Sequence, residues 1–155
     1  TSRFLTLTKG TGVINRIFHG YGKFEGEMDG RKNGALISMS TGKAVAFAIF
    51  NLQARGEMFV THNDPVYEGM IVGLTPKPGD MIRNVMKGKQ LTNMRTQGTD
   101  ENVVLTPVRQ MSIAEQLSML KTDEALEITP KSLRLRKAIL NPHDRKKSEK
   151  SGAAA

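Results

Sequence analysis

Two apolar runs joined by a short polar break constrain the fold of this chain more than any other feature. Residues 35–39 and 43–50 flank a Ser-Thr-Gly break that ends at Gly42. A glycine in such a break is typical of a hairpin, where one residue needs a left-handed conformation. In the second run, large apolar side chains alternate with alanines, so both faces are apolar. The pattern predicts a β-hairpin whose second strand is buried on both sides, as in a small packed barrel.

The remaining periodicity predicts short strands and a few helices, and therefore an α+β fold that is mainly β. Short apolar runs bounded by glycine or by Asn-Asp-Pro indicate strands. Ser112 followed by Glu115 indicates a helix that begins with a capping box. The expected elements are an extended segment at 12–21, a helical turn at 51–55, strands at 58–60 and 70–72, a helix at 112–121 and a hairpin formed by 126–128 and 133–135.

Positive charge is concentrated in two segments. The chain carries 23 Lys and Arg against 15 Asp and Glu, a formal net charge of +8. Residues 77–98 hold 5 basic and 1 acidic side chains, residues 131–155 hold 8 and 2, and residues 99–130 between them hold 2 and 6. Two basic segments fit contact with nucleic acid, although a solvated surface gives the same pattern. From residue 141 onward we expect a basic, disordered tail.

The first basic segment lies in the longest stretch without clear periodicity. Residues 74–103 are interrupted by prolines and glycines, and so long a connection in a compact domain is usually functional or disordered. We expect residues 80–98 to contact RNA, because arginine and lysine neutralise phosphates while amides and hydroxyls bind sugar and phosphate oxygens. The chain has 6 Phe, 2 Tyr and no Trp, none of them in this segment. A structured RNA held through its backbone and shape therefore fits better than stacking on bases.

The candidate RNA-binding residues come from this segment and from the predicted C-terminal hairpin. In the hairpin, two arginines alternate with leucines and face away from them, since side chains alternate across a strand. The alternative is a solvated loop whose lysines only keep the chain in solution. The candidates are Arg83, Lys87, Lys89, Thr92, Asn93, Arg95, Arg134 and Arg136.

No motif in the chain predicts catalysis. There is no cysteine, which excludes disulfides and thiol chemistry. Three Gly-Lys pairs lack the glycine five residues earlier that a phosphate-binding loop requires. The three histidines have no second ligand at metal-binding spacing, and the paired carboxylates at 100–101 and 123–124 fit charges of a loop or helix flank better than an acid/base pair. We therefore expect no catalytic residue, no metal site and no cofactor in this chain, and no run is long and apolar enough for a membrane helix.

Several long motifs resemble those of the BipA/TypA translational GTPases. They follow the family's order and spacing and cover about residues 3–147, so the resemblance is specific. It implies that residues 1–30 end a fifth domain like that of elongation factor G, with an α/β ferredoxin-like fold. It also implies that 31–140 are the family's own C-terminal domain, a small OB-like β-barrel with a capping helix and a long basic loop. The matching segments are residues 30–38, 44–56, 66–73, 88–95 and 127–137.

The resemblance also implies a function. A ribosome-docking region would reach the A site and contact ribosomal RNA and the acceptor end of tRNA through residues 75–100, in translation or ribosome assembly under stress. GTP and magnesium would bind a missing N-terminal domain, so this fragment is expected to be no enzyme itself. We expect a monomer in the bacterial cytoplasm or an organellar stroma or matrix, with no membrane partner. The alternatives are a free-standing OB-type nucleic-acid-binding protein without GTPase activity, and a scaffold domain.

Overall fold

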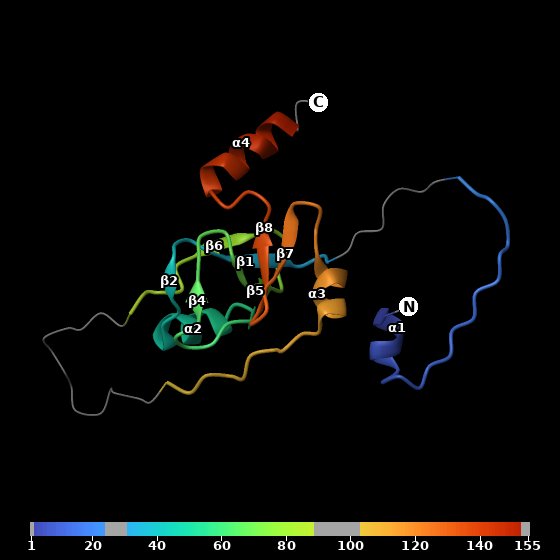
Figure 1. Cartoon of the computed structure of the whole chain (residues 1–155), viewed down its shortest axis with the longest axis horizontal. Coiled ribbons are helices and arrows are strands. Elements are labelled where there is room, and N and C mark those ends of the chain that lie inside the picture. The colour runs from blue at the N-terminus through green and yellow to red at the C-terminus, as the bar shows by residue number, and fades with distance from the viewer. Residues whose placement is uncertain (1, 24–30, 89–102, 153–155) are drawn as a thin grey trace, which may run out of the picture.

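A mixed four-stranded sheet forms the body of the molecule (Figure 1). The computed structural model describes residues 2–23, 31–88 and 103–152. Its helices are α1 (Ser2–Leu7), α2 (Ala46–Gln53), α3 (Ile113–Met119) and α4 (Pro142–Gly152). Its strands are β1 (Gly34–Ser38), β2 (Gly42–Lys43), β3 (Glu57–Met58), β4 (Pro65–Val66), β5 (Ile71–Thr75), β6 (Met81–Arg83), β7 (Glu124–Ile128) and β8 (Leu133–Lys137).

Strand β1 lies inside this sheet and is buried on both faces. The strand order is β3-β5-β1-β6, with β1 antiparallel to β5 and parallel to β6. Leu36 belongs to one apolar cluster, and Ala35 and Ile37 belong to another, because successive side chains of a strand point to opposite faces. The two-sided burial that the sequence predicts for residues 43–50 is therefore found in the first of the two apolar runs.

The predicted second strand of the hairpin is wrong, because residues 46–53 form α2. This helix buries Ala48, Ile49 and Leu52, a spacing of one and four residues that places them on one side of a helix. Alanine, leucine and glutamine also favour helix over strand. Alternation of large residues with alanines is compatible with either structure, and the buried Leu52 continues the helical period past the end of the strand-like run.

Gly42 serves a close contact and not a left-handed turn. It belongs to β2, where it pairs with Val66 of β4. A Cβ on Gly42 would lie only 2.2 Å from the sulfur of Met86, so a side chain here would displace that methionine from the core. The described glycines with positive φ are Gly10, Gly69 and Gly79.

The α+β class is confirmed, but the strands of the described residues form open sheets and no closed barrel. The pairs β2-β4 and β7-β8 are separate two-stranded sheets. In residues 2–23, the only regular element is α1, and the segment 12–21 forms no strand. Its Ile17 and Tyr21 side chains are exposed, and without a partner strand an extended segment has no ladder to form. The ferredoxin-like remnant and the boundary at residue 31 stay predictions.

The C-terminal elements largely follow the sequence signals. The capping box of α3 is confirmed, because Ser112 Oγ accepts from the Glu115 amide at 3.3 Å and Glu115 Oε2 accepts from the Ser112 amide at 2.9 Å. That second hydrogen bond lowers the pKa of Glu115. The predicted hairpin is also confirmed as β7 and β8, with Leu126 opposite Leu135 and Ile128 opposite Leu133.

The expected disordered tail differs from the structure, which has α4 over most of that range. Asn141 precedes the helix and accepts from the amide of His143 through its side chain at 2.8 Å. Pro142 occupies the first helical position, where its fixed φ suits a helix and its missing N–H costs nothing. Asp144 in the first turn and Lys150 in the last turn complement the helix dipole. The Asn-Pro pair is therefore a helix start.

Candidate nucleic-acid interface

The structure places the predicted RNA-binding residues in two separate parts of the molecule. Arg83 is the last residue of β6, and Lys87 follows it as an exposed side chain. Arg134 and Arg136 lie on β8, which pairs with β7 and joins the main sheet through a bridge between Arg136 and Met70. The other four candidates lie outside the described residues: Lys89, Thr92, Asn93 and Arg95.

The first part of the basic segment is a strand and not a loop. Residues 81–83 pair with β1, and Val85 is completely buried. The carbonyl of Arg83 accepts from the Met39 amide at 2.9 Å, which fixes the backbone. The guanidinium of Arg83 contacts the sulfur of Met81 at 3.6 Å, while its Nε is buried and has no hydrogen-bond partner among the described residues. Arg83 therefore stands at the base of the basic segment with an unused donor.

The two ends of α2 hold the chain at Val85, within the basic segment, and at Thr106, beyond it. On the outgoing side, the Val85 carbonyl accepts from the amide of Val45, the N-cap of α2, at 2.9 Å. On the returning side, the Gln53 side chain donates to the Thr106 carbonyl at 2.7 Å and accepts from the Thr106 amide at 3.1 Å. An eight-residue helix is about 12 Å long. The intervening chain therefore starts and ends at two fixed points separated by roughly this length.

The two arginines of β8 share one carboxylate. Arg134 lies opposite Glu127 in the hairpin, with NH1 3.3 Å from Oε1, and Arg136 Nε lies 4.0 Å from Oε2. The Tyr67 hydroxyl donates to the same Oε2 at 2.7 Å. Burial and this hydrogen bond to Glu127 raise the pKa of Tyr67 to about 12. The group has a net charge of +1, and both arginine side chains stay about one-third exposed, so it offers a weaker anion site than two free arginines.

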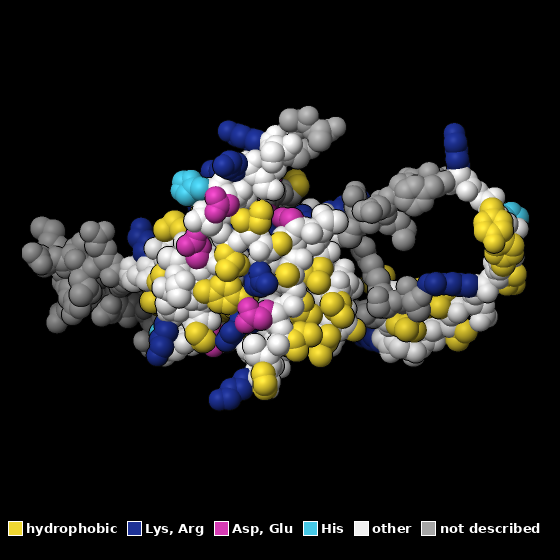
Figure 2. Space-filling view, turned by 45° about the horizontal axis from the view of Figure 1, so that its top comes forward, with side chains coloured by type: hydrophobic (Ala, Val, Ile, Leu, Met, Phe, Trp, Pro, Cys, Tyr) yellow, Lys and Arg dark blue, Asp and Glu magenta, His cyan; other side chains and the backbone are white. Residues whose placement is uncertain are grey.

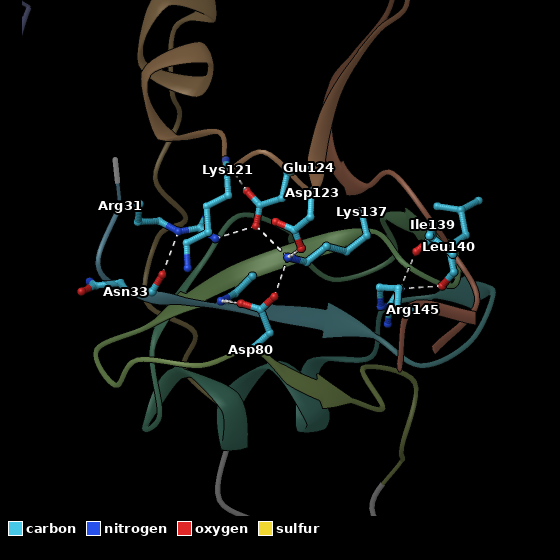
Figure 3. A network of polar contacts seen from close by, with 11 residues as sticks. Arg31, Asn33, Asp80, Lys121, Asp123, Glu124, Lys137, Ile139, Leu140 and Arg145 are labelled. Atoms are coloured by element: carbon cyan, nitrogen blue, oxygen red, sulfur yellow. Dashed lines mark hydrogen bonds and ion pairs between the residues drawn. The ribbon is translucent and has the colours of Figure 1, made fainter. Parts of the chain in front are cut away.

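A buried lysine is the feature that the sequence reasoning missed (Figure 3). The Lys137 side chain is 1% exposed, and its Nζ lies 2.5 Å from Asp80, 2.6 Å from Asp123 and 3.1 Å from Glu124. We call these residues, with Arg31, the Lys137 cluster, because Arg31 NH2 lies 2.7 Å from the fully buried carboxylate of Glu124. The cluster joins β8 to the start of β7, to the turn before β6 and to the chain entering β1.

The charges of the Lys137 cluster stabilise one another. Burial lowers the pKa of Lys137, but hydrogen bonds with Asp123 and Asp80 and the charge of Glu124 raise it more, so the pKa is raised overall. For Asp80 the directions are reversed. Burial raises its pKa, but the hydrogen bonds from Lys137 and from the Ala35 amide lower it by more, so the pKa is lowered overall. The sequence does contain a signal for this cluster. Lys137 lies two residues after Leu135 and four after Leu133, so its side chain points to the same, apolar face of β8.

The second basic segment is presented by α4. Figure 2 shows Lys and Arg side chains around this helix at the top of the view. Arg145 donates to the carbonyls of Ile139 at 2.9 Å and Leu140 at 2.6 Å, so its guanidinium orients the helix. An open hollow of about 440 Å³ separates α4 from the Lys137 cluster. The exposed lysines of α4 are Lys146, Lys147 and Lys150.

Residues 2–23, 31–88 and 103–152 contain neither a membrane-spanning helix nor a group of metal-binding side chains. None of the helices there is long and apolar enough to cross a membrane. In the same ranges, no three His, Asp or Glu side chains are grouped so that they could hold a metal ion.

The family model and the similar proteins both indicate the same family. Residues 33–142 match the family model described as the TypA/BipA C-terminal domain. Three proteins named "Large ribosomal subunit assembly factor BipA" align with nearly the whole chain. The protein of Buchnera aphidicola subsp. Schizaphis graminum is 48% identical over 150 residues, 96% of this chain. That of Salmonella typhimurium is 45% identical over 150 residues, also 96% of the chain. That of Escherichia coli strain K12 is 45% identical over 151 residues, or 97%. The chain spans 25% of the length of each relative.

Proposed function

This chain belongs to the TypA/BipA family through its C-terminal domain, and from that premise we propose that it docks on the large ribosomal subunit by binding ribosomal RNA. The relatives' name, large ribosomal subunit assembly factor, makes that subunit the partner to test first. The observation that carries the proposal is the basic segment, residues 77–98, whose chain is anchored at one end of α2 through Val85 and, beyond the segment, at the other end of α2 through Thr106. A charged segment leaving a fixed base reaches a partner with less loss of conformational freedom.

The proposal extends to the place of contact. By the family resemblance, the basic segment reaches the ribosomal A site and the acceptor end of tRNA, and the contact serves translation or ribosome assembly under stress. Arg83 and Lys87 begin the contact, Lys89, Thr92, Asn93 and Arg95 continue it, and α4 adds salt-sensitive attraction. We also propose that GTP and magnesium bind in the part of the longer relatives that this chain does not cover, and that the protein acts in the cytoplasm.

The test is binding of the 155-residue chain to purified large ribosomal subunits, measured by co-sedimentation across a salt series. We expect the triple variant Lys87→Ala, Lys89→Ala, Arg95→Ala to bind more weakly, with the difference largest at low salt. Each lost phosphate contact should reduce the slope of log affinity against log salt by about 0.7–0.9. Melting curves should barely change, since exposed charges contribute little to folding.

The matched control removes the same charge elsewhere. Lys23, Lys32 and Arg55 are exposed side chains outside the basic segment, and replacing these three by alanine should leave the slope and the affinity nearly unchanged. Equal losses in both variants would show that only the overall charge matters, which refutes the assignment to the basic segment. Equal affinity of the chain for an unrelated RNA hairpin and for the subunit would favour the second candidate, a general nucleic-acid-binding domain.

A further inference from the structure

An open groove lies between the chain that follows β3 and the β7–β8 hairpin. It has a volume of about 780 Å³ and runs between residues 59–61, the segment before α3, and the β7–β8 hairpin. Its floor is apolar, because Phe59, Ile71, Met111 and Leu135 line it and belong to one hydrophobic cluster. None of the residues proposed for RNA binding in the basic segment lines this groove.

A buried acceptor in the groove wall lacks a partner. Gln116 lines the groove and is 7% exposed. Its Nε2 donates to the Met111 carbonyl at 3.4 Å, but its Oε1 is buried with no hydrogen-bond partner within the described residues. Leaving a buried acceptor unsatisfied is unfavourable, and most such groups in proteins are paired. The groove therefore favours a ligand that brings an N–H group to this oxygen.

Among the described residues, no strand pairs with the edge of β8 that borders the groove. Ala138 donates its amide to Asp123 on the β7 side, whereas Lys137 donates to Gly69 on the opposite side, each at 2.9 Å. Along an antiparallel pair these directions alternate from residue to residue, so Leu133 turns its amide and carbonyl away from β7, as Lys137 does. The bridge to the main sheet involves Arg136, and Leu133 lies beyond it, along the groove.

Three of the four charged residues that line the groove are cations: Arg109, Lys131 and Arg134, with Asp64 as the fourth. Arg109 lies 3.5 Å from the carboxylates of Glu57 and Glu115, and Arg134 lies 3.3 Å from that of Glu127. Lys131 is therefore the rim cation that has no carboxylate partner among the described residues. The Asp64 carboxylate already accepts from the amide and hydroxyl of Thr61, at 2.6 and 2.9 Å. Lys131 is exposed in the turn between β7 and β8. A ligand that carries carboxylates on its outward side is therefore complementary in charge.

We infer that this groove binds an extended, acidic peptide segment of a partner protein, added as a strand to the free edge of β8. Main-chain hydrogen bonds to Leu133 would give affinity, and alternate side chains would enter the apolar floor or face the basic rim. A backbone N–H of the peptide satisfies Gln116 Oε1 once the Gln116 side chain turns toward the groove, since this oxygen is buried in the free chain. An unstacked nucleotide fits less well, because Phe59 is the one aromatic side chain among the lining residues and base recognition relies on aromatic stacking.

The test uses the 155-residue chain labelled with ¹⁵N and the synthetic peptide acetyl-Val-Glu-Val-Asp-Val-Glu-Val-amide. We expect the Leu133 amide and the Gln116 side-chain amide to shift on titration, and hydrogen exchange at Leu133 to slow. Lys131→Glu should weaken binding at least tenfold, while Lys77→Glu, an equal charge reversal outside the groove, should not. Gln116→Met, which removes the acceptor, should weaken binding about fivefold.

Two peptide controls and one nucleotide control complete the experiment. A peptide N-methylated at alternate residues, which cannot form the strand ladder, should not bind. Absence of shifts at Leu133 with the unmethylated peptide, or equal binding of the methylated one, overturns the strand-addition proposal. Shifts of the same residues with uridine monophosphate but not with the peptide would overturn it in favour of a nucleotide site. The ribosome-binding test changes residues of the basic segment and not of the groove. A failure of one proposal therefore leaves the other standing.

Discussion

Replacing Lys137 by methionine is the most direct test of what holds the body together. The substitution keeps an unbranched side chain of similar length but removes the charge that lies between three carboxylates. Breaking a buried ion pair by removing one partner typically costs about 3–5 kcal/mol. Glu124 keeps its contact with Arg31, and Asp123 is more than half exposed. We therefore expect the lower end of that range, about 3 kcal/mol.

Urea unfolding followed by circular dichroism measures this loss as a change in the free energy of unfolding. The matched control is Lys77→Met, because Lys77 is exposed, and a surface substitution of this kind should stay within about 0.5 kcal/mol. The double variant with Glu124→Gln should cost less than the two single changes together, since contacting residues couple. A loss below about 1 kcal/mol for Lys137→Met would show that the cluster does not hold the body together.

The pH dependence of this stabilisation follows from the two pKa shifts. The pKa of Asp80 is lowered in the folded protein, so its contribution is present above its unfolded pKa of about 3.9 and is lost as the pH falls through the folded pKa. The pKa of Lys137 is raised, so its contribution is present below about 10.4 and is lost as the pH rises through the folded pKa. The stability difference between wild type and Lys137→Met should shrink at both extremes.

Two further variants test local features. Ser112→Ala removes the N-cap of α3 and should lower the free energy of unfolding by about 1 kcal/mol. The control Ser118→Ala, inside the same helix, should change the free energy of unfolding by less than about 0.5 kcal/mol. Equal effects of the two substitutions in urea titrations would contradict the stabilising role of the N-cap. In a Tyr21→Phe background, phenolate absorbance reports Tyr67 alone, and its midpoint should lie at about 12. The further change Glu127→Gln removes the carboxylate charge and should lower that midpoint, and an unaltered titration would exclude the charge of Glu127 as a cause.

Local sequence signals identified the elements whose hydrogen bonds close within a few residues. The capping box of α3 and the β7–β8 hairpin were both predictable, because Ser112 bonds Glu115 three residues away and the strands are separated by a short turn. The helix α2 was not, since large residues alternating with alanines satisfy the periods of strand and helix alike. Its burial pattern depends on contacts with the sheet, which no local window contains.

The candidate site was predictable in its charge and not in its geometry. The count of lysines and arginines selected the basic segment, but Arg83 lies on a strand, and Arg134 and Arg136 share Glu127. The groove and the Lys137 cluster are formed by residues far apart in the chain. These residues meet only in the folded structure, so the composition of the sequence does not reveal them. Only for Lys137 does the sequence give an indication, because the alternation along β8 places its side chain on the same face as Leu133 and Leu135.

The Lys137 cluster also sets an order of events during synthesis. The carboxylate of Glu124 is 93 residues from Arg31, and Lys137 supplies the shared ammonium from the last strand. Contacts of such long sequence separation form late, because the intervening chain must first be closed into a loop. Between the end of β6 at Arg83 and Lys137 the ribosome adds 54 residues, which takes roughly 3–11 s at ordinary rates of elongation. For that interval β1, β5 and β6 have been synthesised while the charges of Arg31 and Asp80 lack their partners in the Lys137 cluster, so the nascent sheet must remain soluble without the hairpin that later completes it.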